Sequence, residues 1–312
     1  MRVISQSTSW PDPSVVTIGN FDGVHRGHQA LIHRALTVAR ARQSPMVLLT
    51  FEPHPAKVLR GSLDHFLISP GQSKLDWLEQ AGAQWVRILA FTEEFAAVSA
   101  EEFLDRVLVK ELKATHVVVG YNFSFGRGGL GNVALIDKWA RPKGIGLDVL
   151  EPYRDPKTHD AVSSSLVRAV IREGDVERAE RLLGHPFSVS NRVMPGDQRG
   201  RKLGAPTLNL VWPSEQVELP YGVYAGMVRL GPGAAYPAVA NFGVRPTFDG
   251  AGEPRLEIHL IGPHAGRPYG ETVRFEPMHR IRDERRFDSA EALKVQIQED
   301  VRTAQRLLQG RR

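Results

Sequence analysis

The sequence has no cysteine, which excludes disulfide bonds, cysteine metal sites and thiol nucleophiles. It also has no apolar run close to the ~20 residues that a membrane-spanning helix needs. Its opening residues lack the apolar core of a secretory signal peptide. We therefore expect a cytoplasmic protein with no membrane partner.

The sequence has no basic arm or stripe, and its excess of positive charge is mild. Its 40 lysines and arginines outnumber 35 aspartates and glutamates, which gives a net charge of +5 at pH 7. A basic balance attracts nucleic acid, but the arginines are dispersed, and small phosphorylated molecules need local positive charge equally. We therefore expect no nucleic-acid partner, and a nucleic-acid-binding protein is the least favoured alternative.

The 312 residues are enough for two domains, and the hydrophobic pattern changes character between them. Strand and helix patterns alternate up to residue 151, which predicts a parallel sheet with helices on both faces. From residue 187 short runs of period two predict an antiparallel barrel, followed by an amphipathic helix over 290–308. A Gly-His-Pro breaker separates the two patterns. The expected fold is α/β plus β, with domains 1–184 and 185–312.

The most informative stretch covers residues 18–28. A β-branched run at 14–18 predicts a buried strand, and apolar residues at helical spacing over 29–42 predict a helix. The glycine-rich turn between them suits a polyphosphate, because glycines allow close backbone approach and a helix N-terminus carries partial positive charge. Two polar residues at a solvated helix start are the simpler alternative. The candidate contacts are Gly19, Phe21, Asp22, Gly23, His25 and His28.

Two further loops of the first half follow predicted strands. His54 lies at the strand edge where ligands of parallel sheets bind, although a histidine held between prolines in a rigid loop is an equally good interpretation. Asn122 lies in an aromatic, glycine-rich loop. Its amide would reach a nucleotide while the phenylalanines cover a ring system, or these rings simply pack in the core.

A later helix opens with hydroxyl side chains. The residues are Ser163, Ser164 and Ser165, followed by Arg168. Serines cap the orphan N–H groups of helices in any protein. Three serines and an arginine together suit a triphosphate better.

Glycines and cations gather over residues 196–204 of the second half, where Gly196, Arg201 and Gly204 are the candidate contacts. A phosphate cradle is one interpretation, and a solvated hairpin is the other. Thr207 and Asn209 follow at i and i+2 on one strand face. Their neutral oxygens suit Mg²⁺, which takes few protein ligands beside water and phosphate oxygens.

These motifs resemble those of the bacterial bifunctional riboflavin kinase/FMN adenylyltransferase family. The string GNFDGVHRGHQ at 19–29 is similar to the nucleotidyltransferase superfamily signature and, more narrowly, to FMN adenylyltransferases. The serines with Arg168 resemble the second signature of that superfamily, with Ser165 in place of the usual threonine. The segment 206–209 resembles the riboflavin kinase signature, from which Ala205 and Leu208 depart.

Glu257 alternates with apolar residues along a predicted strand, where a lone glutamate usually faces solvent. The Leu-Glu-x-His-Leu strand that contains it resembles the strand that holds the catalytic base in the family. The segments 241–248, 269–270 and 280–287 also resemble family segments, and all the motifs come in the expected order.

The resemblance implies a Rossmann-like nucleotidyltransferase domain followed by a riboflavin kinase barrel. It implies that ATP is the co-substrate, Mg²⁺ the cofactor, and riboflavin, FMN and FAD the other ligands, with no particular oligomeric state. It assigns catalysis to Glu257 in one half and to His25, His28 and Arg168 in the other, with Thr207 and Asn209 as metal ligands. An adenylyltransferase with an impaired kinase and a flavin- or nucleotide-binding regulator are the alternatives.

Overall fold

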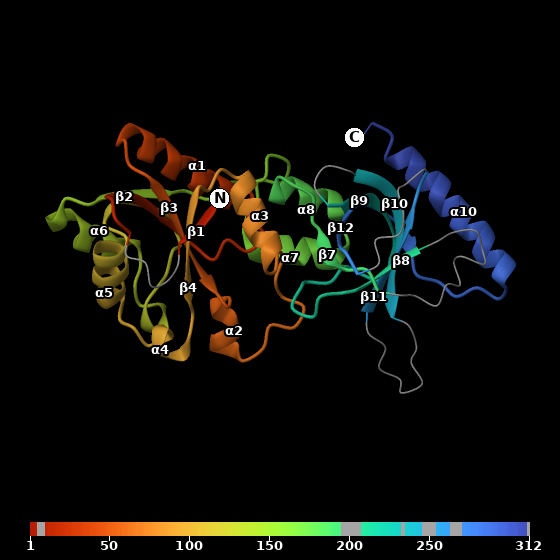
Figure 1. Cartoon of the computed structure of the whole chain (residues 1–312), viewed down its shortest axis with the longest axis horizontal. Helices are drawn as coiled ribbons and strands as arrows, with labels where there is room; N and C mark the ends of the chain where they lie inside the picture. The colour runs from red at the N-terminus through yellow and green to blue at the C-terminus, as the bar shows by residue number, and fades with distance from the viewer. Residues whose placement is uncertain (5–9, 195–206, 232–234, 245–253, 263–269, 311–312) are drawn as a thin grey trace. The chain divides into compact units, whose positions relative to one another are not determined.

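Six parallel strands form the sheet of the first half (Figure 1). The computed structural model describes residues 1–4, 10–194, 207–231, 235–244, 254–262 and 270–310. The strand order is β1-β4-β3-β2-β5-β6 with parallel pairing throughout. This confirms the predicted parallel α/β fold and adds β1, which is too short to give a pattern. The strands are β1 (Arg2–Ile4), β2 (Ser14–Ile18), β3 (Met46–Glu52), β4 (Trp85–Ala90), β5 (Ala114–Gly120) and β6 (Gly146–Leu150).

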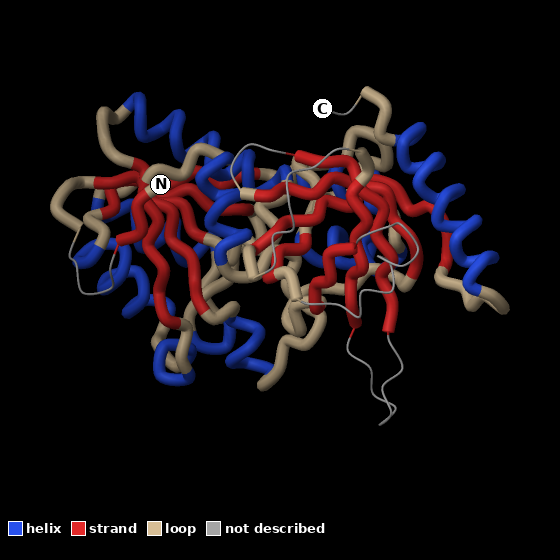
Figure 2. Tube along the Cα trace, turned by 45° about the vertical axis from the view of Figure 1, so that its right-hand side comes forward, coloured by secondary structure: helices blue, strands red, loops and turns tan. Residues whose placement is uncertain are grey.

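Helices cover both faces of this sheet (Figure 2). Alternate residues of β2 enter different apolar clusters, since Val16 packs with η1 and α6, whereas Val15 packs with α1 and α3. Both faces are therefore filled, and the strand ends are left for ligands. The helices are α1 (Arg26–Ala41), α2 (Pro55–Arg60), α3 (Gln72–Gln80), α4 (Glu93–Ala96), α5 (Ala100–Phe103), the π-helical η1 (Leu104–Glu111), the 3₁₀ turns η2 (Arg127–Gly129) and η3 (Arg141–Lys143), and α6 (Val133–Ala140).

Six antiparallel strands form the second sheet, in the order β7-β12-β9-β10-β11-β8. Its two edge strands nearly meet, because the Met194 backbone amide donates to the Asn209 carbonyl at 2.8 Å and the Asn191 side-chain amide donates to the Val211 carbonyl at 2.8 Å. The predicted antiparallel barrel is confirmed as a nearly closed one. The strands are β7 (Val189–Arg192), β8 (Thr207–Val211), β9 (Gly222–Leu230), β10 (Ala235–Val244), β11 (Pro254–Leu260) and β12 (Thr272–Asp283).

The C-terminal helix α10 (Ala290–Leu307) packs on the outer face of the barrel. Its Ala304 lies in an apolar cluster with Val223 of β9 and Val239 of β10. The neighbouring residues on these strands, such as Tyr224 and Phe242, are fully buried. The alternation of strand residues thus separates the barrel interior from the outer face that α10 partly covers.

Chain contacts divide the protein into two compact units. The first unit is Met1–Leu63 with Ser69–Ser164, and the second unit is Asp64–Ile68 with Ser165–Arg312. The second unit therefore includes almost all of α7 (Ser164–Glu173) and all of α8 (Val176–Leu183), which the sequence analysis places in the first domain. The boundary at 184/185 stays a prediction.

The five residues 64–68 join the second unit through backbone hydrogen bonds. The Phe66 amide donates to the Glu215 carbonyl at 2.9 Å, and the Val217 amide donates to the Leu67 carbonyl at 2.8 Å. The buried Gln216 side chain donates to the Ile68 carbonyl at 3.0 Å. No feature of the local sequence signals this segment, because its partners lie about 150 residues away.

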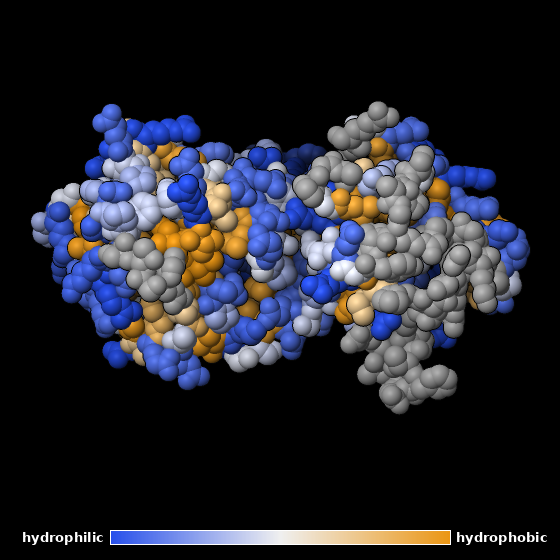
Figure 3. Space-filling model, viewed as in Figure 1, coloured by the Kyte–Doolittle hydropathy of each residue, from blue (hydrophilic) through white to orange (hydrophobic). Residues whose placement is uncertain are grey.

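Most of the surface that Figure 3 shows is hydrophilic, with an apolar area near the middle of the first unit. Scattered apolar surface of this kind is ordinary for folded proteins. Among the helices of the described residues, none combines the length and the apolar composition needed to cross a membrane.

Candidate active sites

The turn after β2 is held in place by buried side chains. Phe21 is fully buried with a φ of 52°, and Gly23 has a φ of 79°, so the chain reverses tightly here. The buried Asp22 carboxylate accepts from the Ser69 amide at 3.1 Å. Its backbone carbonyl accepts from the Ser164 hydroxyl at 2.9 Å. The structure thus brings the predicted turn and one of the predicted serines together.

His25 and His28 form a stacked pair at the start of α1. Their ring centroids are 3.7 Å apart and the planes differ by 15°. His25 caps the helix, since its Nδ1 accepts from the His28 amide at 3.3 Å. Because a neutral imidazole that accepts at Nδ1 carries its proton on Nε2, the cap leaves His25 Nε2–H as a donor. A Cβ at Gly27 would lie 3.1 Å from the His25 ring, so glycine makes room for the pair.

Arg168 lies in the second unit, one helical turn after Ser164 on α7. It is buried, and its Nε donates to the Phe66 carbonyl at 2.8 Å. Its guanidinium carbon also lies 3.8 Å from the centroid of the Phe66 ring, a cation–π contact. The segment 64–68 therefore fixes the orientation of this arginine. Of the other serines, Ser163 is half-buried and Ser165 is exposed.

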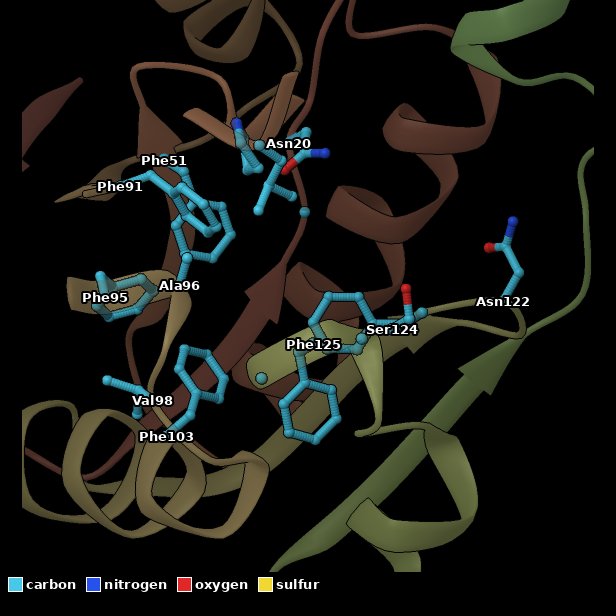
Figure 4. Close-up of a pocket in the computed structure, with 16 residues that line it drawn as sticks. Asn20, Phe51, Phe91, Phe95, Ala96, Val98, Phe103, Asn122, Ser124 and Phe125 are labelled. Atoms are coloured by element: carbon cyan, nitrogen blue, oxygen red, sulfur yellow. The ribbon is translucent and has the colours of Figure 1, made fainter. Parts of the chain in front are cut away.

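An aromatic pocket of about 370 Å³ lies at the carboxyl ends of β2, β3, β4 and β5 (Figure 4). Figure 4 shows Asn122 on the opposite side of this pocket from Phe91 and Phe95. Neighbouring phenylalanine rings have centroids 5.3 to 6.2 Å apart, the spacing of interacting aromatic pairs. The phenylalanines of the lining are Phe51, Phe91, Phe95, Phe103, Phe123 and Phe125, and its polar side chains are Asn20, Asn122 and Ser124.

A slot with aromatic walls and a few amides suits a planar, partly polar ring system. The structure brings Gly19 and Asn122, which the sequence analysis names in separate motifs, together in the pocket lining. Four phenylalanines of the pocket were missed, at 51, 91, 95 and 103. The only available signal is that Phe51 and Phe91 lie at strand ends, where a parallel sheet binds ligands.

His54 caps α2, and its Nδ1 accepts from the Ala56 amide at 3.1 Å. This bond supports the interpretation of His54 as part of a rigid loop. The end of β3, directly before this loop, is held by Lys74, a buried lysine that was not predicted. Its ammonium donates to the Phe51 carbonyl and to the Glu52 carboxylate, each at 3.2 Å.

A second group of polar residues lies on the outer face of the barrel, across β8 and β11. Glu257 is directly opposite Asn209, and His259 is directly opposite Thr207. Opposite residues of antiparallel strands share a face, so the structure brings the predicted residues Glu257, Asn209 and Thr207 together, and it places His259, which was not predicted, beside them. Asn209 is buried and Glu257 half-buried. The predicted contacts Gly196, Arg201 and Gly204 lie outside the described residues.

The chemistry of this group fits Mg²⁺ bound to a nucleotide. In the part of the chain that the structure describes, no three His, Cys, Asp or Glu side chains gather into a metal site. Thr207 and Asn209 instead offer neutral oxygens beside one carboxylate, and Mg²⁺ completes such a shell with water and phosphate oxygens.

Two tyrosines of the second unit have raised pKa values. Burial raises the pKa of Tyr224 to about 12, and its hydroxyl donates to the Pro220 carbonyl at 2.6 Å. Burial also raises the pKa of Tyr221, with further contributions from the charges of Glu218 and Glu284. Both phenols therefore stay protonated near neutral pH.

Comparisons with known proteins match both halves of the chain. The FAD synthetase family model matches residues 7–166, and the riboflavin kinase family model matches residues 183–308. The chain is 38% identical to the bifunctional riboflavin kinase/FMN adenylyltransferase of Escherichia coli (strain K12), over 93% of this chain and 91% of the relative. It is 34% identical to the protein of the same name from Bacillus subtilis (strain 168), again over 93% and 91%.

A solved structure, described as the macrolide-efflux protein from Streptococcus pneumoniae, is similar over the whole length. Its TM-score is 0.85 at 30% sequence identity, and the match covers 97% of this chain and 98% of that chain. The same succession of a parallel sheet and a barrel therefore occurs in that protein.

Proposed function

The chain belongs to the bifunctional riboflavin kinase/FMN adenylyltransferase family, and from this premise we propose which residues carry out each of its reactions. It phosphorylates riboflavin with ATP to give FMN, and it joins FMN to the adenylyl group of ATP to give FAD and pyrophosphate. The observation that carries this conclusion is the match of one family model to each half of the chain. Glu257, Thr207 and Asn209 on one face favour a working kinase over an impaired one or a binding regulator.

In the adenylyltransferase half, the phosphate of FMN attacks the α-phosphorus of ATP, and the bond from that phosphorus to the bridging oxygen of pyrophosphate breaks. The attacking phosphate is already ionised, so no protein nucleophile is needed. His25 Nε2–H, His28 and the N-terminus of α1 would donate to the phosphate oxygens as charge shifts to pyrophosphate. The hydroxyls of 163–165 and the held guanidinium of Arg168 would bind the triphosphate.

The aromatic pocket is the proposed site for the flavin ring in this half. Its phenylalanine walls would cover a planar isoalloxazine, and the amides of Asn20 and Asn122 would bind polar ring edges. The turn residue Gly19 belongs to the same lining. The pocket would therefore place FMN next to the phosphate-binding turn, which is the positioning that this reaction needs.

In the kinase half, Glu257 would take the proton from the ribityl 5′-hydroxyl while that oxygen attacks the γ-phosphorus of ATP. Thr207 and Asn209 would hold Mg²⁺, which neutralises charge on the phosphates when bound. The segment 196–204 would bind the phosphates with its glycine amides and cations. We place both reactions in the cytoplasm, with ATP and flavins as partners and neither nucleic acid nor membrane required.

His28→Ala tests the adenylyltransferase assignment. It should lower FAD formation from FMN by about 10²-fold, the scale for removing one preorganised donor, and leave FMN formation unchanged. HPLC of flavins measures both rates. His33→Ala is the matched control, because His33 is an exposed histidine on the same helix. An equal loss of both activities would contradict the assignment.

Glu257→Gln tests the kinase assignment. Glutamine keeps the shape but does not accept the hydroxyl proton, so FMN formation should fall by about 10²- to 10⁴-fold. Conversion of supplied FMN to FAD should continue at the normal rate. Glu271→Gln, at an exposed glutamate of the same unit, should alter neither rate. Wild-type phosphorylation of riboflavin by Glu257→Gln would show that another group is the base.

We propose that the kinase resides in residues 185–312. A fragment with these residues should form FMN and no FAD, and a fragment that starts at residue 165 is its control, because that start retains α8. The His279 ring and the Glu177 carboxylate join β12 to α8 at 2.5 Å, so the longer fragment should unfold at a higher temperature. A folded 185–312 fragment without kinase activity would refute the boundary.

A further inference from the structure

A second carboxylate, that of Glu284, reaches the outer face of the barrel near Glu257. Glu284 directly follows β12, and its Oε1 accepts from the Asn241 side-chain amide of β10 at 3.4 Å. The Glu284 carboxylate also packs directly against Gly243 of the same strand, since a Cβ at Gly243 would lie only 2.2 Å from Glu284 Oε1. The backbone of Gly243 is extended, so glycine is needed here for space rather than for an unusual φ.

Strand register places Asn241 next to the proposed base. Asn241 is directly opposite Glu257 on β11, and Glu257 is directly opposite Asn209 on β8. The Cβ atoms of such pairs lie about 4.5–5.5 Å apart, close enough for side chains to interact. One row across three strands therefore holds an amide, a carboxylate and a second amide.

The hydrogen-bonding capacity of Asn241 suits a place between two carboxylates. Its NH₂ group has two N–H donors, and Glu284 accepts one of them. The Glu257 carboxylate on the opposite strand is an acceptor for the second N–H, and this hydrogen bond would be charge-assisted. Arg282 shares this row through its pairing with Val223, but its guanidinium is held by Asp300 at 2.8 to 3.2 Å.

We propose that Asn241 is a positioning residue for the kinase reaction, which holds the Glu257 carboxylate toward the ribityl hydroxyl with its second N–H. Glu284 keeps the amide in this orientation, and Gly243 leaves the space for Glu284. This inference rests on the proposed role of Glu257 as the base. It adds the side chains of Asn241 and Glu284 to the kinase site. In this role they neither bind the nucleotide nor contact the reacting phosphate.

Two substitutions of Asn241 separate this role from simple packing. Asp has the shape of Asn but only accepts hydrogen bonds when ionised, and it places a third negative charge between two carboxylates. Ala removes the side chain without adding charge. If Asn241 only fills space, Asp is the milder change; if Asn241 donates to both carboxylates, Asp is the more harmful one.

The experiment measures kcat and KM for FMN formation in full-length Asn241→Ala and Asn241→Asp, with FAD formation from FMN as the internal control. We expect Ala to lower kcat by about 10- to 100-fold, the scale for a hydrogen bond to a charged group. Asp should lower it further, while KM for ATP changes little and FAD formation is unchanged. Asp288→Asn, at an exposed carboxylate near Glu284, should match the wild type.

Gly243→Ala and Glu284→Ala provide an independent test. The added methyl group should displace the Glu284 carboxylate, so each change should lower kcat to a similar level and the double variant should be no worse than either one. Additive losses would mean that the two positions act separately. The inference would be overturned if Asn241→Asp lowered kcat less than Asn241→Ala. It would also be overturned if the losses of Gly243→Ala and Glu284→Ala were additive. Either result, together with an inactive Glu257→Gln, would leave the base assignment standing.

Discussion

Successive residues of a strand point to opposite faces of a sheet, and this constraint decides where each active site can lie. In the first unit both faces of β2 carry apolar residues, because Val15 and Val16 enter different clusters under different helices. Neither face of β2 is left for a ligand. The ligand groups therefore gather where the strands end, at the turn of His25 and His28 and at the aromatic pocket.

The same alternation has the opposite consequence in the second unit. The inner face of the nearly closed barrel is buried, with Leu256 and Ile258 of β11 inside. The outer face is covered by α10 over β9 and β10, and the polar residues Asn209, Glu257 and Asn241 lie on that face beyond the apolar cluster. A binding surface across neighbouring strands thus replaces one at the strand ends. The alternation of strand residues thus places one proposed site at the strand ends and the other on the face of a sheet.

The sequence predicts those parts of the protein that are local. The turn at 18–28 and the pair Thr207 and Asn209 lie within single motifs, and both domain types follow from hydrophobic periodicity. Phe51 and Phe91 come from the ends of the neighbouring parallel strands β3 and β4, and Phe95 and Phe103 come from α4 and α5, so no local pattern marks these four residues as one site. The contact of Phe66 with Arg168 depends on which distant segments of the chain meet, and the row from Asn209 to Asn241 depends on strand register. Neither can be predicted from a local pattern in a single sequence.

The two proposed active sites lie in different units of the chain, so we expect FMN to pass between them as a free product. Mixing Glu257→Gln protein with His28→Ala protein tests it directly, in the presence of riboflavin, ATP and magnesium. Each protein lacks one half-reaction, so neither forms FAD at an appreciable rate alone. We expect the mixture to form FAD after a lag in which FMN accumulates. A mixture that makes FMN but no FAD would contradict it.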